Sequence, residues 1–276
     1  MKKELIFQLK NAFFSRNFLL ISLISVCFGI GCFIIKCVGC FGEDIINIPA
    51  AYEQYFANAR SNDYMVVIFS VASPFLVSAA FADSYVAEYY NRYVPVCIIR
   101  TGKNKYYFSK MIAVFICGAF VMMLPQIINL ILCLIAFPLD STRIYTWDLW
   151  QADIYTIDMS SDWFLFKALY VLSPYLYFVL FMLLSGVMAG IIAVIGYELS
   201  FFIRNKIFAV SAMFIFINLS NFLFENYAVA YRIWHCMFGL SVGGNGLRSF
   251  YITCAAYLAA AVLLAPFSLR RLKNCY

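Results

Sequence analysis

The chain has 276 residues, of which 64% are hydrophobic and only 12% are charged. A soluble domain of this length could not cover so much apolar surface with so few charges, so the composition excludes a water-soluble globular protein. Lipid must therefore form part of the solvent. The charges sum to +6, and their positions along the chain indicate which segments face the cytoplasm.

Residues 3–16 are the first predicted element, an amphipathic elbow helix that lies along the inner leaflet. Apolar residues share one helical face and basic residues lie elsewhere: Leu5, Ile6, Leu9 and Phe13, against Lys2, Lys10 and Arg16. The alternative is a solvated N-terminal tail.

Six apolar stretches follow, each long enough for the roughly 20 residues that a membrane-spanning helix needs. They cover residues 18–35, 64–82, 111–139, 168–197, 207–224 and 249–269. We therefore expect an all-α polytopic membrane protein that forms a single transmembrane domain over residues 1–276. Pro125 and Pro174 are the expected kink points of the third and fourth spans.

Lys and Arg are distributed unevenly between the two sides of these spans. With the N-terminus inside, fourteen of the twenty basic residues fall in cytoplasmic segments, whereas ten of the fourteen acidic residues fall outside. The positive-inside rule then predicts that both termini are cytoplasmic, and we expect the protein in the cell (plasma) membrane.

Three outer loops are expected, over residues 37–63, 138–167 and 225–250. The second is an acidic cap with three tryptophans, which could attract a cationic substrate or form a solvated rim: Trp147, Trp150 and Trp163, with Asp153, Asp158 and Asp162. The third is apolar and glycine-rich, and is expected to form a re-entrant or interfacial helix pair.

Several chemistries are excluded by missing residues. The chain has no G-x-x-x-x-G-K-[ST] motif and a single histidine, His235, so neither a nucleotide-phosphate cradle nor a paired-histidine metal site is expected. No acidic residue lies in the middle of a span, which argues against proton coupling and membrane hydrolysis. Cys37 and Cys40 lack a second pair, so we expect structural thiols or an incidental disulfide there.

Uncharged polar residues do occur within the spans. Gln126 and Asn129 lie three apart on one helical face, as do Asn218 and Asn221. They are candidates either for helix–helix hydrogen bonds or for the lining of a translocation path. Gly186 and Gly190 form a small-x-x-x-small pattern that predicts close helix packing.

The cytoplasmic loop 83–110 is basic and rich in tyrosine. A short helix is expected over residues 84–94, distorted at Pro95, followed by a turn at Gly102. Such a loop could contact anionic lipid or dock a cytoplasmic protein. Tyrosine and arginine are enriched in protein interfaces, which favours docking.

This order of features resembles the permease subunit of a type-2 ATP-binding-cassette (ABC) exporter. The stretch most similar to that family runs from Glu88 through Arg100-Thr-Gly-Lys-Asn-Lys105 to Lys110. In the family the helix after the second span couples to an ATPase subunit, which implies that contacts here are made by Glu88, Tyr89, Arg92 and Arg100. The resemblance also implies a second permease copy or paralogue as partner, and no cofactor on this chain.

On this reading the chain is not an enzyme, since ATP and Mg would be held by the separate ATPase. The expected cargo is a peptide, lipid or hydrophobic drug, and membrane lipid, but no nucleic acid, is a further partner. A non-transporting immunity or sensor protein that binds an extracellular peptide through the 138–167 cap is the alternative. A membrane-embedded enzyme is a weaker third reading.

Overall fold

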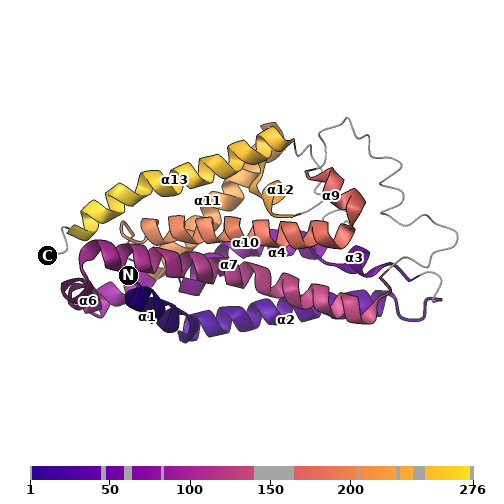
Figure 1. Cartoon of the computed structure of the whole chain (residues 1–276), viewed down its shortest axis with the longest axis horizontal. Coiled ribbons are helices and arrows are strands. Elements are labelled where there is room, and N and C mark those ends of the chain that lie inside the picture. The colour runs from indigo at the N-terminus through magenta and orange to yellow at the C-terminus, as the bar shows by residue number, and fades with distance from the viewer. Residues whose placement is uncertain are drawn as a thin grey trace.

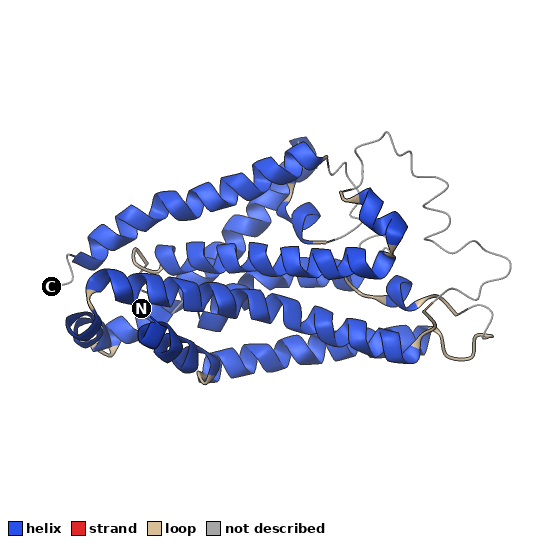
Figure 2. Cartoon of the chain, viewed as in Figure 1, coloured by secondary structure: helices blue, strands red, loops and turns tan. Residues whose placement is uncertain are grey.

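The computed structural model describes residues 2–44, 48–58, 64–81, 84–139, 165–203, 205–227, 231–238 and 246–273. Within these ranges the regular elements are all helices (Figure 2). In chain order they are α1 (Lys2–Phe13), α2 (Arg16–Gly39), α3 (Ala51–Gln54), α4 (Tyr64–Phe81), α5 (Ser84–Tyr90), α6 (Tyr93–Thr101), α7 (Lys103–Ala136), α9 (Lys167–Leu172), α10 (Pro174–Leu199), α11 (Lys206–Tyr227), α12 (Ile233–Met237) and α13 (Leu247–Lys273).

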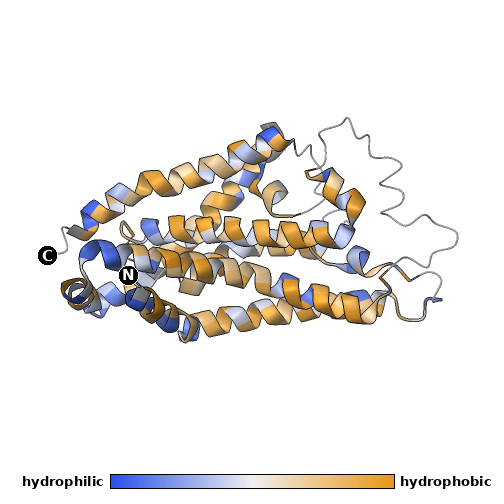
Figure 3. Cartoon of the chain, viewed as in Figure 1, coloured by the Kyte–Doolittle hydropathy of each residue, from blue (hydrophilic) through white to orange (hydrophobic). Residues whose placement is uncertain are grey.

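Six of these helices, α2, α4, α7, α10, α11 and α13, are long and apolar enough to cross a membrane, which confirms the prediction of a multi-pass membrane protein. Hydrophobic residues dominate these helices, whereas polar residues gather toward the helix ends (Figure 3). The described parts of α1, α6 and the end of α13 lie at one end of the molecule, and α3, α9 and α12 lie at the other (Figure 1).

The third and fourth spans depart most from their expected form. The third helix begins at Lys103 rather than 111, so its first two turns carry the basic and aromatic residues of the cytoplasmic loop. The fourth is not a kinked helix over 168–197, because the chain breaks at Ser173 into α9 and α10. Proline disfavours the helical conformation of the residue before it and is well tolerated as a first helical residue, and Pro174 takes that position. Pro125 lies inside the uninterrupted α7.

Helix α10 is the centre of the bundle. Its most apolar window is 72% buried within this chain, compared with 11% for α13, which runs along one side (Figure 1). The most extensive helix–helix contact is between α10 and α7, followed by the contact between α2 and α7. The outward faces of α2, α11 and α13 are therefore left for lipid or for another subunit.

Helix α1 packs against α7 rather than facing only lipid. Phe13 makes edge-to-face contacts with Phe18 and Phe120, with ring centroids 4.9 and 5.7 Å apart. Ile6 was expected on the same apolar face as Phe13, but its side chain is exposed. The helix thus presents one apolar strip to the bundle and a second to its surroundings.

The expected outer loops are described only in part. Of the segment between α2 and α4, residues 49–58 are not at the surface but buried in the bundle. Most of the 138–167 cap, with its three tryptophans, lies outside the described residues. Before α13 the structure describes one short buried helix, α12, where a re-entrant or interfacial helix pair was expected.

Candidate functional site

The cytoplasmic loop forms two short helices joined at a sharp corner. Helix α5 ends at Tyr90, and Arg92 then adopts a left-handed backbone with φ of 57° before α6 begins. The expected helix over 84–94 is therefore wrong in its end. Pro95 is not the cause of the break, because it occupies the first turn of α6, where its missing N–H needs no partner. The expected turn at Gly102 is present, with φ of 82° between α6 and α7.

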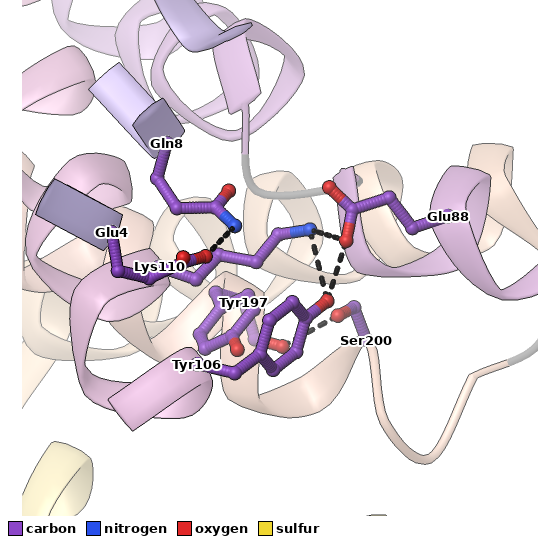
Figure 4. Close-up of polar contacts among 7 residues, drawn as sticks. All are labelled: Glu4, Gln8, Glu88, Tyr106, Lys110, Tyr197 and Ser200. Carbon is purple, nitrogen blue, oxygen red and sulfur yellow. Dashed lines mark hydrogen bonds and ion pairs between the residues drawn. The ribbon is translucent and has the colours of Figure 1, made fainter. Parts of the chain in front are cut away.

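A buried ion pair fastens α5 to α7. Lys110 Nζ lies 2.6 Å from Glu88 Oε2, and the lysine side chain is completely buried while that of the glutamate is 22% exposed. Tyr106, one turn before Lys110, donates a 2.5 Å hydrogen bond to the same carboxylate oxygen (Figure 4). Lys110 Nζ also donates to the Tyr106 hydroxyl at 3.3 Å. A charge on α5 and a charge on α7 therefore neutralise one another inside the protein.

A second buried polar group lies next to this pair and joins three spans. Tyr107 of α7 donates to Glu198 Oε1 of α10 at 2.9 Å, and its hydroxyl lies 2.9 Å from Ser268 Oγ of α13. Tyr85 of α5 stacks on Phe201, which follows α10, with ring centroids 3.9 Å apart. Helix α5 therefore contacts α7 and Phe201 directly, and Tyr107 connects α7 in turn to α10 and α13.

The outward side of the corner is aromatic and basic. We call it the corner surface, and it comprises the exposed residues Tyr89, Tyr90, Arg92, Tyr93, Val96, Ile99 and Arg100. A cavity of about 420 Å³ opens on it, lined by Tyr89, Tyr90, Arg92, Val94 and Pro95. Cys97 lies behind this surface, and burial, followed by the carboxylates of Glu88 and Glu4, raises the pKa of its thiol. That thiol is therefore poorly suited to be a nucleophile.

The four residues expected to contact an ATPase divide into two groups. Tyr89, Arg92 and Arg100 lie on the corner surface, free to meet a partner. Glu88 points inward to Lys110, so its carboxylate positions α5 (Figure 4). Lys110, Tyr107 and Glu198 were not among the sequence candidates. The available signal was a charged residue next to an uninterrupted apolar run, which requires a buried partner.

The amides in the third span are held in packing contacts. Gln126 donates to Ser185 of α10 at 2.9 Å and accepts from the Tyr55 hydroxyl at 3.1 Å. Asn129 donates to the Gly29 carbonyl of α2 and accepts from the Phe56 backbone N–H, both at 3.1 Å. These bonds favour the helix–helix alternative, and a role in a translocation path would require them to open.

The asparagines of the fifth span are also bonded. Asn218 donates to the Phe214 carbonyl at 2.9 Å and to the Val71 carbonyl of α4 at 3.3 Å. Asn221 is buried and accepts from the Ile233 backbone N–H at the start of α12, at 3.1 Å.

The glycines of the fourth span lie where α10 meets α7. A Cβ at Gly190 would come within 2.6 Å of the Phe115 ring, and one at Gly186 would overlap Met123. Between α2 and α7, a Cβ at Gly29 would meet backbone rather than a side chain, at 2.7 Å from the Pro125 carbonyl oxygen.

Metal chemistry finds no support among the described residues, where no three His, Cys, Asp or Glu side chains come together as a candidate metal site. Cys37 and Cys40 are not joined by a disulfide in this structure, and the Cys40 sulfur accepts a hydrogen bond from the Gln54 side-chain amide at 3.7 Å. In comparisons with known proteins, no family model, no curated protein and no solved structure matches the chain.

Proposed function

We propose that the chain is the membrane-spanning permease subunit of a type-2 ABC exporter. It would lie in the plasma membrane with both termini in the cytoplasm and work as a pair with a second permease. A separate subunit would bind ATP and Mg and would hydrolyse the ATP. The cargo would be a peptide, a lipid or a hydrophobic drug.

The observation that carries this proposal is the corner surface. A docking site for a cytoplasmic motor needs an exposed recognition surface that is firmly connected to the spans. Tyr90 and Arg92 provide the exposed recognition surface, because both lie beside the cavity of about 420 Å³. The Glu88–Lys110 pair provides the connection, because it fastens α5 to the longest helix of the bundle.

Charge and aromatic side chains together favour an acidic protein partner on this surface. Arg92 and Arg100 are exposed, whereas Glu88, the acid closest to them in sequence among the described residues, is occupied by Lys110. The surface is therefore complementary to an acidic partner. Exposed Tyr90 and Tyr93 add the aromatic anchors that are common in protein interfaces.

The test is co-purification of the tagged chain from its native membrane in mild detergent, with identification of the bound proteins. We expect an ATPase subunit with the unchanged protein and at least a tenfold loss of that subunit with Arg92→Gly. Glycine adopts a left-handed backbone without strain. Arg92→Gly therefore removes the guanidinium group and relieves the backbone strain at the corner between α5 and α6. Loss of the ATPase could then not be attributed to misfolding.

Arg248→Glu is the matched control, because Arg248 is exposed at the start of α13, at the opposite end of the molecule from α6 (Figure 1). It should retain the ATPase. Absence of an ATPase from the unchanged protein in several gentle detergents would contradict the exporter proposal. An ATPase retained by Arg92→Gly and by Tyr90→Ala would place its docking site elsewhere.

A further inference from the structure

Residues 49–58 form an unusual connection between two spans, since all ten are buried. Only Ala51–Gln54 are helical, so most of this backbone lacks regular hydrogen bonds. Irregular backbone within a membrane protein is tolerated where it is enclosed by protein or lines a cavity. The segment must therefore be held by specific partners.

Two aromatic side chains fill the space between the helices. Phe56 packs against Phe28 of α2 and Phe69 of α4, with ring centroids 5.6 and 5.3 Å apart. Tyr55 packs against Phe178 of α10 at 5.4 Å. Both side chains are almost completely inaccessible to solvent. The segment thus inserts a wedge among three different spans.

The wedge is fixed by hydrogen bonds to the fourth neighbouring span, α7. The Tyr55 hydroxyl donates to Gln126 and the Phe56 backbone N–H donates to Asn129. The Ala51 N–H donates to the Pro138 carbonyl just beyond α7, at 2.8 Å. Gln126 and Asn129, which are also candidates for the lining of a translocation path, therefore anchor this segment.

We propose that residues 49–58 are an outer plug, which closes the space between α2, α4, α7 and α10 to water from the extracytoplasmic side. Behind the plug lie the polar groups of Gln126, Asn129 and Ser185, which are inaccessible while Tyr55 and Phe56 are in place. The proposal does not depend on the ATPase, because every contact belongs to this chain.

The test measures whether Ser185→Cys can be reached by a membrane-impermeant maleimide in right-side-out vesicles. Labelling is read at the Ser185 peptide by mass spectrometry, so the native cysteines do not interfere. We expect almost no labelling with the plug intact. Adding Tyr55→Ala and Phe56→Ala should raise the labelling rate at least tenfold.

Phe41 provides two controls, because its side chain is 91% exposed on the same connection. Phe41→Ala should leave Ser185→Cys protected. Phe41→Cys should itself be labelled in right-side-out vesicles, and labelling only in inside-out vesicles would overturn the outer placement.

Tyr55→Phe is a milder variant in case the double substitution disturbs folding. It removes only the hydroxyl that binds Gln126, and should raise the hydrogen-exchange rate of the 49–58 peptide several-fold while α7 and α10 stay protected. Rapid labelling of Ser185→Cys with the native plug would overturn the proposal. Continued protection of Ser185→Cys in a folded Tyr55→Ala/Phe56→Ala protein would also overturn it.

Discussion

At the scale of single residues, Lys110 is a buried cation that is held by contacts with three other side chains. It is fully buried, its charge faces Glu88, and it lies over the rings of Tyr106 and Phe81 at 5.4 and 5.9 Å from their centroids. Breaking a buried pair by removing one partner leaves the other charge uncompensated. Loss of the Glu88 carboxylate should therefore destabilise the protein more than loss of the Lys110 charge, because the glutamate is partly exposed and water can solvate it.

We predict that Glu88→Leu destabilises the protein by about 3 kcal/mol, because it removes the carboxylate that faces the buried Lys110 ammonium group. Lys110→Met should cost less, and the double variant Glu88→Leu/Lys110→Met should recover much of the loss. Thermal unfolding of the three variants in one detergent measures this. Additive effects of the two changes would contradict a direct interaction between them.

The resemblance to the exporter family implied the same docking role for Glu88 as for Tyr89, Arg92 and Arg100. Nothing in the spacing says that the Glu88 carboxylate turns toward α7, since its partner is 22 residues away in the chain. The same limit applied to Glu198, which forms its hydrogen bond with Tyr107, 91 residues away. Pairing over such distances is decided by how the helices pack.

At the scale of elements, the close approach of α2 to α7 depends on one glycine. Gly29 meets the backbone of Pro125, which cannot move aside as a flexible side chain could. Gly31, on the same helix two residues later, has no heavy atom within 4 Å of the position that its Cβ would take. An alanine at each of the two positions therefore compares a crowded site with an open site on the same helix.

We predict that Gly29→Ala lowers the free energy of unfolding by about 2 kcal/mol, because overpacking displaces α2 from α7. Gly31→Ala should be neutral or slightly stabilising, because alanine favours the helix. Melting temperatures in the same detergent test this pair. Equal effects of the two substitutions would contradict the close contact between α2 and α7.

At the scale of the whole molecule, the described parts of α1, α6 and the end of α13 share one end (Figure 1). The six candidate spans among the described helices agree with the proposal that both termini lie on one side of the membrane. The excess of Lys and Arg near these segments favours the cytoplasm as that side.

We predict that a fluorescent reporter fused after the last residue is active, and that alkaline phosphatase fused there is inactive, because only the first folds in the cytoplasm. A phosphatase inserted after Phe41 should be active, because that position belongs to the connection between α2 and α4. The reverse pattern would invert the topology, and with it the assignment of the plug to the outside.

The sequence by itself determined the helical class, the six spans and the basic loop, because each depends on local composition and on helix length in a bilayer. It also located the polar and small residues at which spans meet. Only the tertiary structure decided the inward direction of Glu88 and the return of residues 49–58 into the bundle. Those features depend on partners far away in the chain, such as Phe56 with Asn129, and such contacts exist only after the helices have packed.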